Sequence, residues 1–71
     1  MNVNRAVAII GLGDSRHTIA QMRFALSLHP WRNSPDDNAR LNAAEFALKN
    51  WCRFDRARKE ARDNLSKGRA S

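Results

Sequence analysis

The pattern of apolar and polar positions is most regular between residues 34 and 51. Apolar residues recur there at intervals of three and four, which is the spacing of one face of an α-helix. These residues are Leu41, Ala44, Leu48, Trp51 and Cys52. No glycine or proline interrupts residues 36–67. The pattern therefore predicts a long helix that continues past residue 51 along one apolar stripe and frays near residue 66.

The start of this helix is marked by local capping signals. The Ser34 hydroxyl is suited to accept a hydrogen bond from a free backbone N–H at the first turn, and Pro35 suits the first helical position. Asp36 and Asp37 follow where the positive end of the helix dipole favours carboxylates. Asp37 also stands three residues after Ser34, as in a capping box.

A second helix is predicted from Ser15 to Leu28. Its apolar stripe is Ile19, Met22 and Leu26, whereas Phe24 falls on a different face. His29-Pro30 ends it, because the residue before a proline is pushed out of the α region. Only a short connection then leads to Ser34, so the two helices are expected to form an antiparallel hairpin.

The N-terminal segment is harder to assign. Residues 1–5 are expected to be disordered, and Ala6–Ile10 is an apolar run that fits either a strand or a short helix. Gly11 and Gly13 interrupt whatever precedes them. The predicted fold class is mainly α: one domain over residues 1–71, built as a helical hairpin or a three-element helical domain, with residues 66–71 also disordered.

Size and charge limit the functions that fit. A chain of 71 residues buries too little surface for a deep, water-excluding active site. The formal net charge is +6, and most of the cations are arginines, whose planar donors suit carboxylates and phosphates. The composition favours an acidic partner, either a protein surface or a nucleic acid.

The cysteine count and hydropathy suggest where the protein works. Cys52 is the only cysteine, so an internal disulfide and an oxidising compartment are not implied. The apolar run at residues 6–10 is too short for a secretory core or a membrane span. We expect a soluble monomer in the cytoplasm of a host cell, without membrane association.

The residues that suggest chemistry are few. Gly11-Leu12-Gly13-Asp14 precedes a helix, but the third glycine of a dinucleotide fingerprint and the Lys of a P-loop are missing, so we interpret it as a turn. His17, His29 and Cys52 match no zinc spacing, and Cys52 is expected to be a buried thiol. We therefore predict no catalytic residue, metal or cofactor, and a protein that is not an enzyme.

Aromatic and arginine residues off the main stripe are the candidates for partner contact. Phe46 lies well around the helix from Leu41, so either the N-terminal segment or a partner must cover it, and coverage within the fold is favoured. The C-terminal segment supplies a basic face that is either a contact surface or a solvated helix. The predicted partner-binding residues are Trp31, Arg32, Phe46, Arg53, Phe54, Arg56 and Arg58.

The same basic segment also fits a sequence-tolerant nucleic-acid-binding protein. Asp55, Glu60 and Asp63 dilute its positive charge, which argues against a dedicated DNA clamp. A helix-turn-helix over residues 6–28 is a related alternative, with residues 15–18 facing the bases. It requires a helix at Ala6–Ile10.

The chain resembles the very small helical proteins of lytic bacteriophages, in which an HPW or PW turn precedes an S/T-P-x-D cap. Here the turn is His29-Pro30-Trp31 and the cap is Ser34-Pro35-Asp36-Asp37. In length and basic composition it is similar to phage inhibitors of bacterial host RNA polymerase. That resemblance implies a regulator that binds a polymerase subunit, blocks initiation and can alter termination; an inhibitor of another host system is the alternative. No contact residue is carried over from it.

Overall fold

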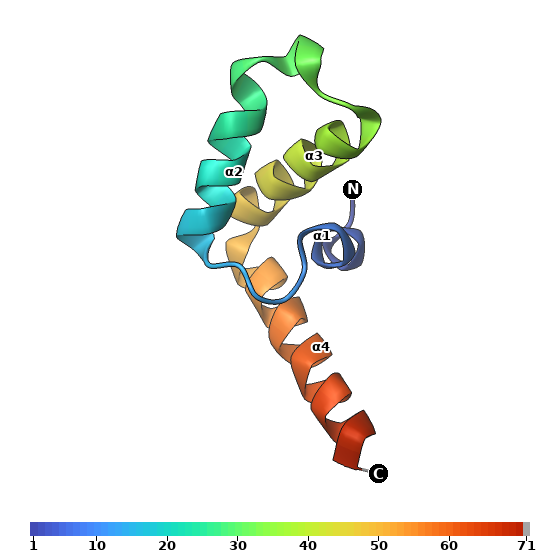
Figure 1. The fold of residues 1–71 in the computed structure, drawn as a ribbon. Coiled ribbons are helices and arrows are strands. Elements are labelled where there is room, and N and C mark those ends of the chain that lie inside the picture. The colour runs from blue at the N-terminus through green and yellow to red at the C-terminus, as the bar shows by residue number, and fades with distance from the viewer. Residues whose placement is uncertain (71) are drawn as a thin grey trace.

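The fold is entirely helical across the residues that the structure, a computed structural model, describes: the backbone of residues 1–70 and the side chains through residue 65. The elements are α1 (Val3–Ile10), α2 (Arg16–Leu28), the 3₁₀ turn η1 (Pro30–Arg32), α3 (Pro35–Lys49) and α4 (Trp51–Ala70) (Figure 1). The predicted mainly α class is confirmed, and the N-terminal segment is a helix rather than a strand. The disorder predicted for residues 66–71 lies outside the residues described in full.

The predicted hairpin is formed by α2 and α3, which pack side by side. The Ser34 hydroxyl accepts the Asp37 N–H at 3.1 Å, and the Asp37 carboxylate accepts the Ser34 N–H at 3.3 Å, which completes the capping box. The Asn33 side chain donates to the Leu26 carbonyl at 2.8 Å and so fastens the connection to the end of α2. Short-range capping therefore fixes where the chain reverses.

The start of the chain is ordered, and the prediction that residues 1–5 are disordered is wrong. The Asn2 side chain caps α1 by accepting the Arg5 N–H at 2.8 Å. Ala6 is fully buried, and α1 packs against α3 and α4. At the end of α1, Gly11 has φ +94, a left-handed conformation that strains other residues. Burial of the apolar face of α1 against the rest of the core offsets the entropy cost of ordering this short helix.

The core is built from small side chains on α3 and two larger ones from its neighbours. Its fully buried members are Ala6, Ile19, Ala43, Ala44, Ala47 and Phe54. Because α3 lies between α1 and α2, its buried face must admit two helices closely, and alanine permits that approach. The predicted stripe is therefore wrong in phase: Ala44 is buried, Leu41, Leu48 and Trp51 are half-buried, and Cys52 is exposed.

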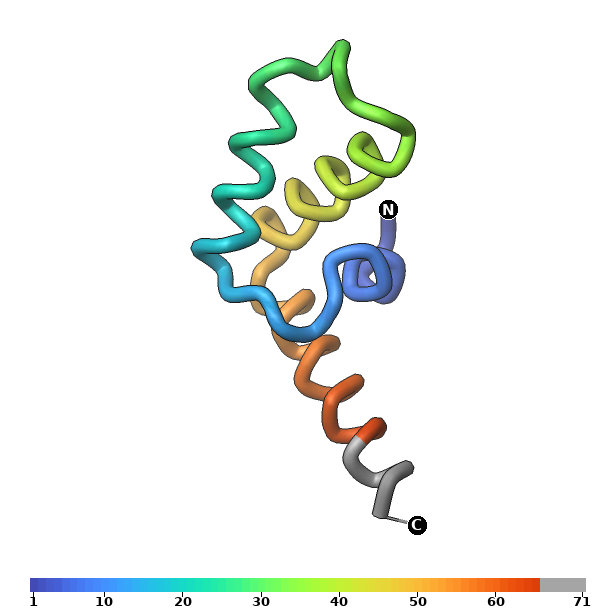
Figure 2. The backbone as a smooth tube through the Cα atoms, in the orientation of Figure 1, coloured from blue at the N-terminus to red at the C-terminus, as the bar shows by residue number. Residues whose placement is uncertain are grey.

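The long helix predicted through residue 51 is in fact two helices, and this corrects the prediction. α3 ends at Lys49, and Asn50 leaves the helical region with φ −121 and ψ 46. The Phe46 carbonyl accepts both the Asn50 backbone N–H at 2.9 Å and the Asn50 side-chain amide at 3.2 Å. Figure 2 shows the chain changing direction there before α4 begins. At about 100° per residue, Phe54 and Arg58 lie within about 20° of the direction of buried Ala47, and both are buried as well.

Candidate partner-binding surface

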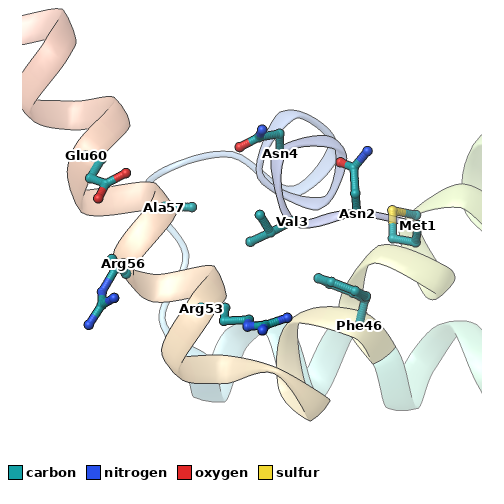
Figure 3. Close-up of a pocket in the computed structure, with 9 residues that line it drawn as sticks. All are labelled: Met1, Asn2, Val3, Asn4, Phe46, Arg53, Arg56, Ala57 and Glu60. Atoms are coloured by element: carbon teal, nitrogen blue, oxygen red, sulfur yellow. The ribbon is translucent and has the colours of Figure 1, made fainter.

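A groove of about 560 Å³ opens between the start of α1 and α4. Phe46, Arg53 and Arg56 line it, so three of the predicted contact residues meet although they come from two helices (Figure 3). Phe46 is half-buried, whereas both arginines are exposed. In Figure 3 the Arg53 side chain extends toward Phe46, and Arg56 points outward from α4. The groove thus has an apolar base with cations on one side.

The other wall of this groove comes from the N-terminus, which sequence reasoning missed. Met1, Asn2, Val3 and Asn4 line it, and Val3 also packs against the core. Phe46 lies beneath these residues and is itself packed on the core, so coverage of Phe46 within the fold was the right alternative. The Asn2 cap followed by an amphipathic α1 was the available signal.

The electrostatic field in the groove is positive. Arg53 and Arg56 form no ion pair with any side chain that the structure describes, and Glu60 is the only acidic residue lining the groove. Their guanidinium donors are therefore available to acceptors on another molecule. Such donors beside an aromatic residue are typical of protein–protein hot spots.

Arg58 is buried, only 4% exposed, and holds the fold together instead of contacting a partner. It donates one hydrogen bond to the Asp14 carbonyl and pairs with Asp55 at 3.1 Å. Its guanidinium carbon also lies 5.1 Å from the centre of the Trp51 ring and 4.9 Å from that of Phe54. Arg58 thereby ties α4 to the loop that follows α1.

Phe54 is also fully buried, so the predicted contact roles of Phe54 and Arg58 are corrected. The physical reason is the helical phase: the predicted stripe followed Leu41 and Leu48, whereas the buried face follows Ala47, which lies seven and eleven residues before Phe54 and Arg58. This phase places these two residues, four apart, on the inner face of α4. The turn of residues 11–14 also has a role within the fold, because the Asp14 carbonyl accepts a hydrogen bond from Arg58.

Asp55 balances the buried cation. Its hydrogen bond from Arg58 lowers the pKa of the Asp55 carboxyl below its ordinary value, and a second bond from Lys59, whose Nζ lies 3.2 Å away, acts in the same direction. The carboxylate therefore stays charged into mildly acidic solution. Lys59 itself is well exposed, so most of the effect comes from Arg58.

Trp31 and Arg32 lie elsewhere, on η1 at the far end of the hairpin from α4 (Figure 1). Trp31 is 78% exposed and meets only the edge of the His29 ring, with centroids 5.2 Å apart. The predicted contact residues are thus divided between the α1–α4 groove, the η1 turn and the buried core.

Other kinds of site have little support among the described residues. No three histidine, cysteine or acidic side chains come together there as potential metal ligands. Within the same part of the chain, no helix is both long enough and apolar enough to cross a membrane. His17 and His29 are exposed and lie at opposite ends of α2.

Comparison of the chain with protein-family profiles, with curated proteins and with solved structures found no match.

Proposed function

We propose that the chain is a non-enzymatic, phage-type regulator that binds a subunit of bacterial RNA polymerase and inhibits transcription initiation. The supporting observation is the α1–α4 groove, where exposed Arg53 extends toward half-buried Phe46 and exposed Arg56 also lines the α4 wall. An aromatic side chain flanked by arginines is the composition that dominates binding energy at protein interfaces. The partner suited to it is an acidic protein surface with an apolar projection.

The groove favours a protein over a nucleic acid as the partner. Met1, Val3 and Ala57 add apolar area, and Glu60 would repel a phosphate backbone. The helix-turn-helix alternative has the helix at residues 6–10 that it required, but Ser15 caps α2 and Arg16 lies 5.5 Å from the Trp51 ring centre. Ser15 and Arg16, two of the four residues proposed to face the bases, therefore already have roles within the fold.

Binding to purified polymerase tests the proposal directly. The immobilised full chain is expected to capture bacterial core enzyme or holoenzyme at modest salt and to reduce promoter-dependent run-off transcript. The double variant Arg53→Glu/Arg56→Glu should weaken capture at least tenfold, because both cations become repulsive toward an acidic surface. Arg40→Glu/Arg62→Glu is the matched control with the same change of four charge units, since both arginines are exposed and neither lines the groove.

Two results would contradict the proposal. One is the failure of the wild-type chain to capture any polymerase subunit. The other is an equal loss of affinity in the groove variant and in Arg40→Glu/Arg62→Glu, which would indicate attraction by net charge alone. Parallel titration with duplex DNA and RNA covers the alternative: tight, steeply salt-dependent binding there, without polymerase affinity, would favour a nucleic-acid-binding protein.

A further inference from the structure

A second exposed surface lies away from the α1–α4 groove. Phe24, Leu28 and Trp31 are 64%, 52% and 78% exposed, respectively. Phe24 and Leu28 are four residues apart and are neighbours on one face of α2, and Trp31 follows in η1. We call these three residues the α2 outer face. Two large exposed apolar side chains that neighbour each other on a helix, with a third three residues further along the chain, are a candidate interaction site rather than singly scattered residues.

The fold leaves this surface uncovered because α2 uses its opposite side to pack. Ile19 is fully buried, and Met22 and Leu26 are half-buried, where α2 meets α3. Figure 1 shows α2 at one edge of the molecule with α3 on one side of it only. The α2 outer face therefore contributes nothing to the core.

The surroundings of this surface are positively charged. Between Asp14 and Asp36 the sequence contains three arginines, two histidines and no acidic residue. Arg23 and Arg32 are exposed on the elements that carry the apolar side chains. From α3, Glu45 lines a depression with Arg23, but Lys49 lines the same depression, so the local balance stays positive.

We propose that the α2 outer face binds an acidic amphipathic helix of a partner protein, with apolar residues one turn apart and Asp or Glu beside them. Apolar anchors at helical spacing match Phe24 and Leu28, and flanking carboxylates match Arg23 and Arg32. A second copy of the chain fits poorly, because a two-fold contact would set these arginines against their own copies. A bilayer fits poorly as well, since the more apolar side of α2 faces the core.

A synthetic probe tests this surface independently of polymerase binding. The probe is a fluorescently labelled helical peptide with leucines one turn apart and glutamates on both flanks. The full chain is expected to bind it, and the indole N–H signal of Trp31 should shift in NMR spectra while that of Trp51 does not. Phe24→Ser and Trp31→Ala should each weaken binding at least tenfold. Leu65→Ser is the control, since Leu65 is 58% exposed on α4.

The same peptide-binding assay distinguishes the α2 outer face from the α1–α4 groove. Arg53→Glu/Arg56→Glu should retain peptide affinity within about threefold at moderate salt, because exposed charges act weakly at a distance. The proposal is overturned if the wild-type chain does not bind the peptide, if a permuted peptide of equal composition binds as well, or if the groove variant loses affinity as the Trp31 variant does. Binding of anionic vesicles or single-stranded oligonucleotides through Trp31, with none of the peptide, would also overturn it.

Discussion

The inner and outer faces of α4 use the same residue type for opposite purposes. On the inner face, Arg58 is buried against the Trp51 and Phe54 rings and is bound to Asp14 and Asp55. On the outer face, Arg53 and Arg56 are exposed, lack ion pairs among the described side chains, and line the groove beneath α1.

This difference shows that the number of arginines in a segment does not measure the strength of a binding surface. Arg58 donates from both terminal guanidinium nitrogens to Asp14 and Asp55, while its buried Nε has no hydrogen-bond partner among the described residues, and only the arginines that point outward remain for a partner. The helical phase decides which role each residue takes, and Phe54 and Arg58 share the phase of buried Ala47. Substitutions on the inner face should therefore change stability, and those on the outer face should change binding.

Phe54→Ala is expected to have the largest effect on stability. Removing the largest fully buried side chain should lower the free energy of unfolding by about 3–5 kcal/mol, through lost burial and the cavity left behind. Urea denaturation followed by circular dichroism measures it. Phe24→Ala, at a 64% exposed position, is the control and should change it by less than about 0.5 kcal/mol.

The Phe54→Ala chain is expected to be close to unfolding, because small domains have little stability to spare. Phe54→Leu keeps most of the apolar volume and should cost less than about 1.5 kcal/mol. Equal midpoints for Phe54→Leu, Phe54→Ala and the wild type would show that the inner face of α4 is not part of the core.

Arg58→Ala should have the next largest effect. It should lower the free energy of unfolding by roughly 1–3 kcal/mol, because the Asp14 carbonyl and the Asp55 carboxylate lose a charged donor. Arg58→Lys should recover only part of this, since an ammonium cannot reproduce the planar contacts to two rings. Thermal melts report both. Full recovery by lysine would mean that charge alone, rather than the stacked geometry, holds α4 in place.

Asp55→Asn should lower the melting midpoint less than Arg58→Ala and in a pH-dependent way. The pKa of the folded Asp55 carboxyl is lowered by Arg58, so its stabilisation is complete above the unfolded pKa of about 3.9 and is lost as pH falls through the folded value. The midpoints of wild type and variant should differ at neutral pH and converge in acid. A difference that persists unchanged in strong acid would contradict the ion pair.

The smallest effect on stability is expected for Arg53→Glu/Arg56→Glu. Both side chains are exposed, so the free energy of unfolding should change by no more than about 0.5 kcal/mol while polymerase capture falls. Differential scanning calorimetry beside the capture assay provides the comparison. A large drop in the melting midpoint would place these arginines among the residues that maintain the fold.

Local signals in the sequence were sufficient for much of the fold. The capping box at Ser34, the serine cap at Ser15 and the stop at His29-Pro30 correctly indicated α2, α3 and their hairpin. These features depend on neighbours within four residues, which is why they can be read from the chain alone. The Asn2 cap was equally local and was overlooked because terminal residues commonly fray.

The break at Asn50 and the phase of α4 depend on tertiary contacts instead. No glycine or proline marks the break, and asparagine occurs in many contexts within helices and at their ends. The alanine face of α3 was masked because larger residues on neighbouring positions form an equally regular stripe. The groove was anticipated through Phe46, Arg53 and Arg56, whereas its N-terminal wall and the burial of Phe54 and Arg58 follow from how α1 and α4 pack.

Side-chain NMR of the arginines in isotope-labelled protein tests the division of α4 most directly. A guanidinium held between two rings and two acceptors should rotate slowly, so Arg58 should give separate, exchange-protected N–H signals that disappear in Arg58→Lys. Arg53 and Arg56 should give averaged signals that exchange rapidly with water. Rapid averaging at Arg58, or restricted signals from Arg53 and Arg56, would contradict the assignment of the inner face to the fold and the outer face to binding.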